Sequence, residues 1–540
     1  MKNSAFRKKL TLTLVCLFVT ASYLPIINGS ETKYDSVTTS KNQYENQLTS
    51  SEWRQLIGEE NAGFGKNTNI GLRGIEIFND ELYLGTQSFN KSKILDCPSI
   101  DAIINFNRFF DNDLSQSLTI ITMKRNPFSF ILSRNLKYFN YFIEPWLSSS
   151  LNLAMHMRAK MSDGCEIWRY NYSTDAWNQI IGDRSNADMS SGFGDNKNLA
   201  ASVFKEFKGK LYVGTWTSPL NGCEIWRYDG IYWEQLIGKN AVIKGGFNDS
   251  NNIAAWCMEE FNGCLYVGTM NWDYTSIGGC QVWRTNNGND WEKVVDRGFR
   301  DFLSDSEQNV HNTYAWSVCI YKDQLYIGTF NTNSVFSMDN SGCQLWRSSE
   351  GINWEKVSFP GGNGFGEPEN YGVRSMAVYQ DDLYIATATD AYQPNGLNVQ
   401  GCEIWKFDGE NWTEMIGEGK SDNFEKDGFG NKWNKYIWSI DVSSDDKLWA
   451  GTLNMQIRVI GENTEGCEVW CYDGESWKPI VKNEIGEIEN GFGYLYNEGA
   501  RVMKELPVGS GNIVIGTFKV VKPPKISEGC EVWIREIPTI

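Results

Sequence analysis

A pentapeptide that occurs seven times constrains this chain more than any other feature. It reads Gly-Cys, then Glu or Gln, then an aliphatic residue and Trp, and its cysteines are 58, 57, 63, 59, 65 and 63 residues apart. Each copy follows a segment that ends in Gly-Thr or Ala-Thr, and most copies precede a second Trp. Each unit therefore predicts four short strands, A to D. Four strands in a repeat of about 40 to 60 residues are typical of a β-propeller blade. The cysteines are Cys165, Cys223, Cys280, Cys343, Cys402, Cys467 and Cys530.

The two ends of the chain complete one blade between them. The last copy of the motif has no strand D after it, whereas residues 52–58 form a strand D with no unit before it. Pairing these two segments closes a ring and removes the open edges of a linear stack. The sequence therefore predicts an all-β fold, a seven-bladed β-propeller with four-stranded blades over residues 51–540, closed by an N-terminal strand that completes the last blade.

The first fifty residues have a different composition. Residues 1–30 have a cationic start, an apolar stretch and small residues at the end, which predicts a signal peptide, and residues 31–50 predict a polar linker. An uncleaved N-terminal anchor is the alternative, because the apolar stretch is near the length of a membrane span. No later segment is apolar enough to span. We expect a secreted or cell-surface protein.

Charge and histidine content narrow the function classes. The formal net charge of -17 disfavours nucleic-acid binding, since phosphates would be repelled. The chain has only 2 histidines, which excludes a metal site built on three imidazoles. We expect no metal, no cofactor, a monomer, and a glycan or a protein as the partner.

Turn sequences predict the hairpins. Links such as Lys208-Gly209 and Asn262-Gly263 predict two-residue turns between strands A and B. Asp229-Gly230 predicts the same between strands C and D, and counting outward from it pairs Trp226 with Trp233. With a loop one residue longer in two blades, the same reasoning predicts a Trp–Trp pair across strands C and D around the whole ring.

The cysteines divide into two groups. Neighbouring blades pack about 10 Å apart, so the seven motif cysteines are too distant from one another to form disulfide bonds. We expect them to be small buried side chains. Cys97, Cys257, Cys264, Cys319 and Cys471 remain, and one or two bridges among them are possible in an exported protein.

The loops that vary most should share one face. In a four-stranded blade the B–C and D–A connections lie at the same end, and here they are long and divergent, which predicts the binding face. The first B–C loop is an insertion over residues 88–163 with a net charge of +3. It is either a lid or partner dock, or an insertion without a role.

The start of strand A holds the candidate site. Every strand A begins with Asn, and four residues later the chain has Arg73, Ser202, Trp256, Trp316, Arg374, Trp438 and Arg501. Strand A is innermost, so this second set should lie near the mouth of the central channel, where Arg could hold a carboxylate or sulfate and Trp could stack on a sugar. The alternative is that Arg and Trp pack between blades and that Asn caps the D–A loop. The predicted ligand-binding residues are Arg73, Arg374, Arg501, Trp256, Trp316, Trp438, Asn252, Asn312 and Asn370.

Two hairpins carry a family resemblance. Residues 284–291 and 347–354 resemble the Asp-box hairpins of the sialidase-like, BNR-repeat propellers, although Arg replaces the first Ser and Asn286 or Ser349 replaces the Asp. The resemblance implies an exported propeller, and the arginine triad of sialidases implies a carboxylate-binding role for Arg73, Arg374 and Arg501.

Two function classes follow. The first is a non-catalytic binding module for a glycan or protein ligand on the loop-rich face, because the repeat explains nearly every recurrent residue. The second is a glycan hydrolase or lyase of sialidase-like type, in which the arginines bind an anionic sugar and His311, Asp273 or Asp390 serves as acid or base.

Overall fold

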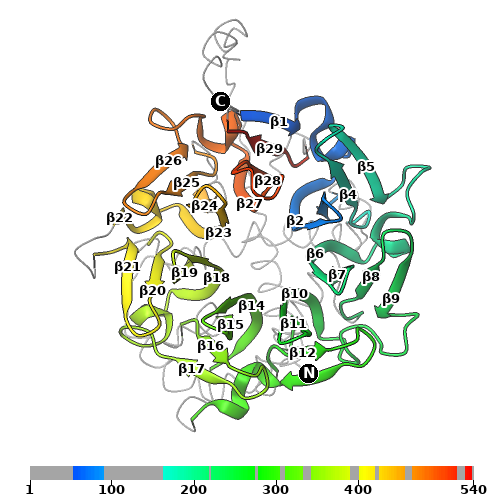
Figure 1. Ribbon diagram of the computed structural model, residues 1–540, viewed down its shortest axis with the longest axis horizontal. Coiled ribbons are helices and arrows are strands. Elements are labelled where there is room, and N and C mark those ends of the chain that lie inside the picture. Colours follow the sequence, from blue (N-terminus) through cyan, green and yellow to red (C-terminus); the bar gives the residue numbers. More distant parts are fainter. Residues whose placement is uncertain are drawn as a thin grey trace, which may run out of the picture.

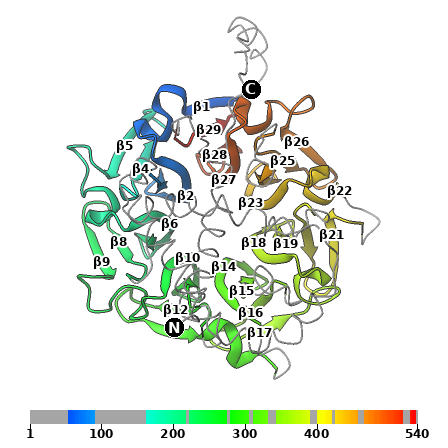
Figure 2. The same ribbon diagram turned by 180° about the vertical axis from the view of Figure 1, so that it is seen from behind.

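The computed structural model describes residues 53–90, 162–217, 221–273, 278–304, 310–331, 342–389, 400–419, 425–456, 465–519 and 529–537. These residues form seven antiparallel blades around one axis, with strand A innermost (Figures 1 and 2). The A strands are β2 Asn69–Phe78, β6 Asn198–Phe207, β10 Asn252–Phe261, β14 Asn312–Tyr321, β18 Asn370–Tyr379, β23 Asn434–Ser443 and β27 Asn497–Glu505. The B strands are β3 Glu81–Ser88, β7 Lys210–Thr217, β11 Cys264–Asn271, β15 Gln324–Asn331, β19 Asp382–Thr389, β24 Lys447–Asn454 and β28 Ile513–Lys519.

The outer half of each blade is shorter. The C strands are β4 Ile167–Asn171, β8 Ile225–Tyr228, β12 Val282–Thr285, β16 Leu345–Ser348, β20 Ile404–Phe407, β25 Val469–Tyr472 and β29 Val532–Arg535. The D strands are β5 Ala176–Ile181, β9 Trp233–Ile237, β13 Glu292–Val295, β17 Glu355–Val357, β21 Trp412–Gly417, β26 Trp477–Val481 and β1 Trp53–Ile57. One further strand, β22 Glu425–Lys426, runs parallel to β21. Short 3-10 turns lie in the D–A links: η3 Glu59–Gly65, η4 Ser191–Gly194, η5 Arg297–Phe302, η7 Asn363–Gly366, η8 Asp427–Gly430 and η9 Asn490–Gly493.

The ring closes as the sequence predicts. Strand β1 pairs with β29, with Gln55 opposite Trp533, so the first described strand completes the last blade. A second closure lies inside. Strand B of every blade pairs at one position with strand A of the next, as Trp216 does with Ala254, and Phe518 with Gly71 completes the circle. The A and B strands thus form one continuous inner ring without a free edge.

The A–B turns confirm the sequence prediction. Phe207 pairs with Lys210, which leaves Lys208 and Gly209 as a two-residue loop, and both have positive φ, 51° and 70°. This is the backbone that a type I′ hairpin requires.

The predicted Trp–Trp pairs are wrong. Trp233 lies opposite Tyr228, and Trp226 lies opposite Gln235, so the C–D loop has four residues instead of two. The reason is the side chain of Asp229, which accepts hydrogen bonds from the backbone N–H groups of Ile231 and Tyr232, at 2.9 and 2.7 Å, and so extends the turn. Asp408 and Asp473 accept the equivalent pairs of bonds in their blades.

A phenylalanine joins the two tryptophans instead. Blades are numbered one to seven in the order of their A strands. Phe193, in the link before blade two, stacks on Trp226 with ring centroids 4.7 Å apart and contacts Trp233 edge-on at 5.2 Å. Every other blade repeats this arrangement with a Phe that follows a Gly in the D–A link: Phe64, Phe247, Phe299, Phe365, Phe429 and Phe492. Each such contact is worth about 0.5 to 1.5 kcal/mol beyond area burial. The repeated aromatic residues therefore anchor each D–A link to the blade that follows it.

The motif cysteines lie at the seam between blades. The backbone N–H of Cys165 donates to the carbonyl of Asn198 in the next blade at 2.9 Å, and the Cys165 carbonyl accepts from Gly192 at 2.7 Å. All seven are buried free thiols, as predicted. Cys257, Cys264, Cys319 and Cys471 are also free thiols, whereas Cys97 lies outside the described residues. Among the residues described, no helix is long and apolar enough to cross a membrane.

Candidate functional site

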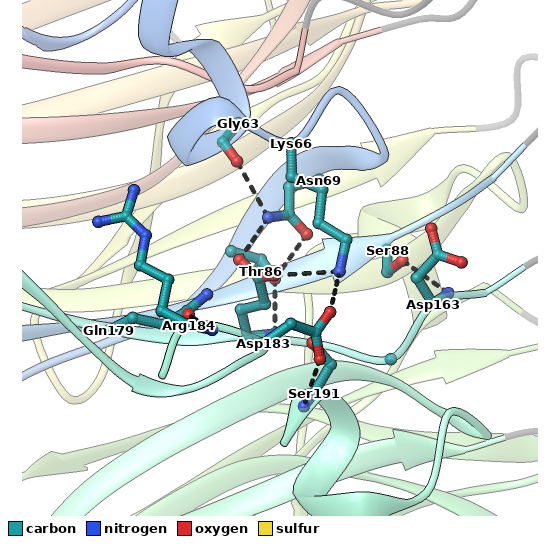
Figure 3. Close-up of polar contacts among 12 residues, drawn as sticks. Gly63, Lys66, Asn69, Thr86, Ser88, Asp163, Gln179, Asp183, Arg184 and Ser191 are labelled. Carbon is teal, nitrogen blue, oxygen red and sulfur yellow. Dashed lines mark hydrogen bonds and ion pairs between the residues drawn. The ribbon is translucent and has the colours of Figure 1, made fainter. Parts of the chain in front are cut away.

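The asparagines that begin the A strands are scaffold residues in every blade. Asn252 is 0% exposed, and its amide donates to the carbonyl of Gly246 at 2.9 Å and to Oε1 of Gln281 at 2.7 Å. Figure 3 shows the corresponding contacts in the first blade, where Asn69 reaches Gly63 and Thr86. Asn312 and Asn370 make the same bond to the Gly carbonyl of their D–A links. The amides of these three asparagines are therefore engaged within the protein, and whether they also contact a ligand stays a prediction.

The position four residues later is a β-bulge in every A strand. In β10 the register shifts between Ala255 and Cys257, so Trp256 has no partner on β11, and the same irregularity recurs at Arg73, Ser202, Trp316, Arg374, Trp438 and Arg501. A bulge redirects the side chain of the extra residue and bends the strand. This geometry turns the seven side chains away from the regular faces of the blades.

Contacts that skip a blade place this set near the axis. The guanidinium of Arg73, in blade one, lies 4.2 Å from the ring of Trp256 in blade three. Trp316, in blade four, packs against Tyr436 in blade six with centroids 5.9 Å apart. Residues two blades apart can touch only close to the axis of a propeller. The structure thus brings the predicted arginines and tryptophans together into an axial cluster, which also contains Gln87, Trp216, Tyr371, Tyr436 and Phe518.

The three arginines occupy two different environments. Arg501 Nη1 and Arg73 Nε both donate to Oε1 of Gln87, at 2.7 and 3.2 Å, so these two guanidiniums converge on one amide oxygen. Trp216 lies 4.7 Å from the Arg73 guanidinium and Trp438 lies 4.5 Å from that of Arg501. Such cation–π contacts stabilise by about 0.5 to 2 kcal/mol each.

Arg374 lies apart from this pair. Its guanidinium is 5.2 Å from the Trp316 ring, and its Nε is shielded from solvent with no hydrogen-bond partner in the described part of the chain. Burial lowers the pKa of Arg374 to about 10, opposed by the nearby Tyr436. The structure therefore does not gather the three arginines into one triad.

Sequence reasoning missed the aromatic and amide residues that complete the cluster. Gln87, Trp216 and Phe518 directly follow the Gly-Thr or Ala-Thr of strand B and lie next to the last residue of that strand, at a position that differs from blade to blade. They fit against small residues on the next strand A: a Cβ added to Gly71 would lie 2.3 Å from the Phe518 ring. The alternation of large and small residues across this seam is the signal that could have identified them.

A second charged layer lies three residues further along the A strands. It consists of Glu76, Lys205, Glu259, Asp441 and Lys504. Lys205 pairs with Glu259, and Lys504 lies 3.6 Å from Glu76. Asp441 has a pKa raised to about 6, because burial outweighs the attraction of Lys504 and repulsion from Glu76 adds to it.

Two of the candidate acid–base residues of the enzyme hypothesis lie within the described part of the chain. His311 is buried at the entrance of β14, and Asp273 lies at the edge of blade three beside a cavity of about 400 Å³ that Asp249 and Asp296 also line. Asp390 lies outside the described residues. Within the described ranges, no group of three or more His, Cys, Asp and Glu side chains is arranged to hold a metal ion.

The B–C loops of the predicted binding face lie largely outside the described residues. Gaps fall in every B–C loop, and residues 91–161 of the insertion belong to them. The two ends of the insertion meet, because the Asn90 amide donates to the carboxylate of Asp163 at 2.9 Å.

Comparisons with known proteins add similar solved structures and no family. No protein-family model and no curated protein matches the chain. The GH74 xyloglucanase from Xanthomonas campestris is 15% identical with a TM-score of 0.40, over 68% of this chain, which spans 48% of that enzyme. The GH93 α-L-arabinofuranosidase of Fusarium graminearum with arabinobiose is 10% identical with a TM-score of 0.33, over 62% of this chain and 91% of that one. The GH43 α-L-arabinofuranosidase from Clostridium thermocellum is 13% identical with a TM-score of 0.30, over 51% and 91% of the two chains. At these values the similarity carries no information about ligand or activity.

Proposed function

We propose that this protein is a secreted or cell-surface, non-catalytic binding module for a glycan or protein ligand, with an acidic glycan as the preferred class. The ligand binds on the face where the A strands begin, at the axial cluster. The observation that carries the proposal is that Arg73 and Arg501 on one side of the axis, and Arg374 on the other, lie against aromatic rings in a protein whose net charge is -17. Local positive charge in an otherwise acidic molecule attracts and positions anionic groups.

The chemistry of the cluster suits an acidic sugar. Guanidinium groups bind carboxylates and sulfates in a planar, two-bond geometry. Aromatic rings bind the apolar faces of sugars, and Tyr hydroxyls and the Gln87 amide can bond sugar hydroxyls. Arg and aromatic residues are also the side chains that contribute most to protein interfaces, so a protein ligand remains part of the proposal.

The test is mass spectrometry of a mixed panel of acidic and neutral oligosaccharides incubated with residues 31–540. Retention of acidic members without chemical change supports the proposal. The control is the variant with Arg73, Arg374 and Arg501 all replaced by Ala, which should lose retention while it stays folded, with a melting temperature lowered only by the lost contacts to Gln87, Trp216, Trp256 and Trp438. Cleaved products would overturn the non-catalytic assignment, and loss of folding in the variant would show that the arginines pack the ring. If nothing is retained, the glycan part of the proposal fails.

A further inference from the structure

Four residues from three successive blades form a compact group on one side of the axis. Trp316 comes from β14, Tyr371 and Arg374 from β18, and Tyr436 from β23. The Trp316 ring is the centre: it lies 6.4 Å from the ring of Tyr371, 5.9 Å from that of Tyr436 and 5.2 Å from the Arg374 guanidinium. The two tyrosine hydroxyls are hydrogen-bonded to each other. We call this group the Arg374 sector.

The Arg374 sector has more hydrogen-bond donors than acceptors. The indole Nε1 of Trp316 and the Nε of Arg374 are both shielded from solvent, and neither has a partner among the described residues. Trp316 is 6% exposed, so its N–H is not satisfied by bulk water. Indole and guanidinium nitrogens can only donate. The group that completes this sector must therefore bring acceptors.

The charge of the sector indicates the same kind of group. No carboxylate in the described part of the chain forms an ion pair with Arg374. A buried donor without an acceptor costs about 1 to 3 kcal/mol, and a shielded charge without a counter-ion costs more. The lowered pKa of Arg374 is the electrostatic expression of that cost. An anion that accepts a hydrogen bond from either N–H group would recover part of this cost.

We infer that Arg374 and Trp316 form an oxyanion subsite that takes a carboxylate or sulfate group of the ligand. This inference rests on the proposed function and assigns one of its three arginines to the anionic group. Arg73 and Arg501 already donate hydrogen bonds to Gln87, and their guanidiniums lie against the rings of Trp256 and Trp438. These arginines and tryptophans form the opposite side of the axial cluster.

The experiment observes the Trp316 N–H directly. Protein labelled with ¹⁵N-tryptophan is titrated with sodium sulfate, sodium glucuronate or glucose at constant ionic strength, and Trp316→Phe assigns the indole signal. Sulfate or glucuronate should shift this signal downfield in a saturable way, because a hydrogen bond to an anion deshields the proton, whereas glucose should not shift it. Calorimetry of the same titrations gives the affinity.

Matched variants separate the two sides of the axis. Arg374→Gln should weaken binding of the active anion about tenfold or more, since it removes a charge-assisted bond. Trp316→Phe, which keeps the ring and removes only the N–H, should weaken binding by a smaller factor, and Arg73→Gln should leave the Trp316 shift in place. Unchanged affinity in Arg374→Gln would overturn the inference, as would an equal response to glucose.

The two anions also distinguish the ligand. A response to glucuronate alone supports a carboxylate ligand, and a response to sulfate alone supports a sulfate ester. The proposed function and the subsite can fail separately. If acidic oligosaccharides are retained equally by wild-type protein and Arg374→Gln, the subsite is wrong and the binding module stands. If sulfate shifts the Trp316 signal and no glycan is retained, the subsite stands and the glycan ligand is wrong.

Discussion

Asp441 should make the propeller less stable when it is ionised. It lies on β23, in the charged layer next to the axis, and its Oδ1 accepts one hydrogen bond from the backbone N–H of Val442 at 3.0 Å. No ion pair to it is formed within the described residues; Lys504, which attracts it, lies 3.6 Å from Glu76 instead. The substitution Asp441→Asn keeps the shape and the acceptor oxygen and removes the charge.

The size of the effect follows from the two pKa values. Burial raises the pKa of Asp441 to about 6 in the folded protein, against an ordinary value of 3.8. Each pKa unit corresponds to about 1.4 kcal/mol, so the full difference is about 3 kcal/mol. The side chain is partly exposed, and solvent screening should reduce the observed effect to roughly 1.5 to 3 kcal/mol.

The raised pKa also fixes the direction of the pH dependence. Between pH 4 and 6 the folded protein holds a proton on Asp441 that the unfolded chain has released. Stability associated with this group is therefore present below about pH 4 and is lost as the pH rises through 6. Asp441→Asn should match the wild-type protein near pH 4 and exceed it in stability above pH 6.5.

Urea unfolding at several pH values between 4 and 8 measures this difference. The comparison of variant with wild type cancels the other carboxylates, and Asp473→Asn is the opposite control. The Lys478 ammonium and the backbone N–H groups of Ser476 and Glu475 lower the pKa of Asp473. The ionised Asp473 therefore stabilises the folded protein above its ordinary pKa, and this stabilisation is lost as the pH falls. A stability difference between Asp441→Asn and wild type that stays constant from pH 4 to 8 would refute the reasoning.

Three substitutions test the scaffold. Asn252→Ala removes bonds to Gly246 and Gln281 and should cost about 3 kcal/mol by urea unfolding; a loss below about 1 kcal/mol would contradict its role as a cap. Phe365→Leu keeps an apolar side chain but loses the stack on Trp405 at 4.6 Å, and calorimetry should show a loss of about 1 to 3 kcal/mol. Gly372→Ala places a Cβ 2.1 Å from the Trp316 ring, so it should destabilise by about 1 to 3 kcal/mol and change tryptophan fluorescence; wild-type stability and fluorescence would show that the ring moves freely.

The architecture could be predicted because it depends on signals that recur. Seven copies of one motif fix the number of blades, and the orphan strand at the N-terminus fixes the closure. The two-residue turn at Lys208 and Gly209 follows from local backbone preference alone. Each of these features needs only residues that are close together in the sequence.

The C–D turns show where local counting fails. Asp-Gly is a strong signal for a two-residue turn, but the carboxylate of Asp229 captures two backbone N–H groups and adds two residues to the loop. Trp226 and Trp233 then move out of register. The Phe that joins them comes from the preceding D–A link, and no rule about one hairpin could supply it.

The axial cluster could be predicted only in part. The sequence places Arg73, Arg374 and Arg501 at one ring position. The prediction assumed regular strands, in which side chains alternate between the two faces, and such alternation cannot reveal the bulge at this position. Which arginine pairs with which group depends on residues from other blades. Gln87, on strand β3 of blade one, accepts hydrogen bonds from Arg73 of the same blade and from Arg501 of blade seven. Blades one and seven become neighbours only when the ring closes.

Ser202 gives the strongest reason to assign function to the bulge position. In blade two this small residue occupies the position that holds Arg or Trp elsewhere, and its single O–H lies within hydrogen-bond distance of the carbonyls of Gly214 and Ala255, at 3.0 and 2.8 Å. The blade keeps its bulge and its pairing with the next blade. A serine therefore satisfies the fold at this position. Three arginines and three tryptophans are larger and more costly to order than the fold requires at this position, which supports the ligand-binding role proposed for them.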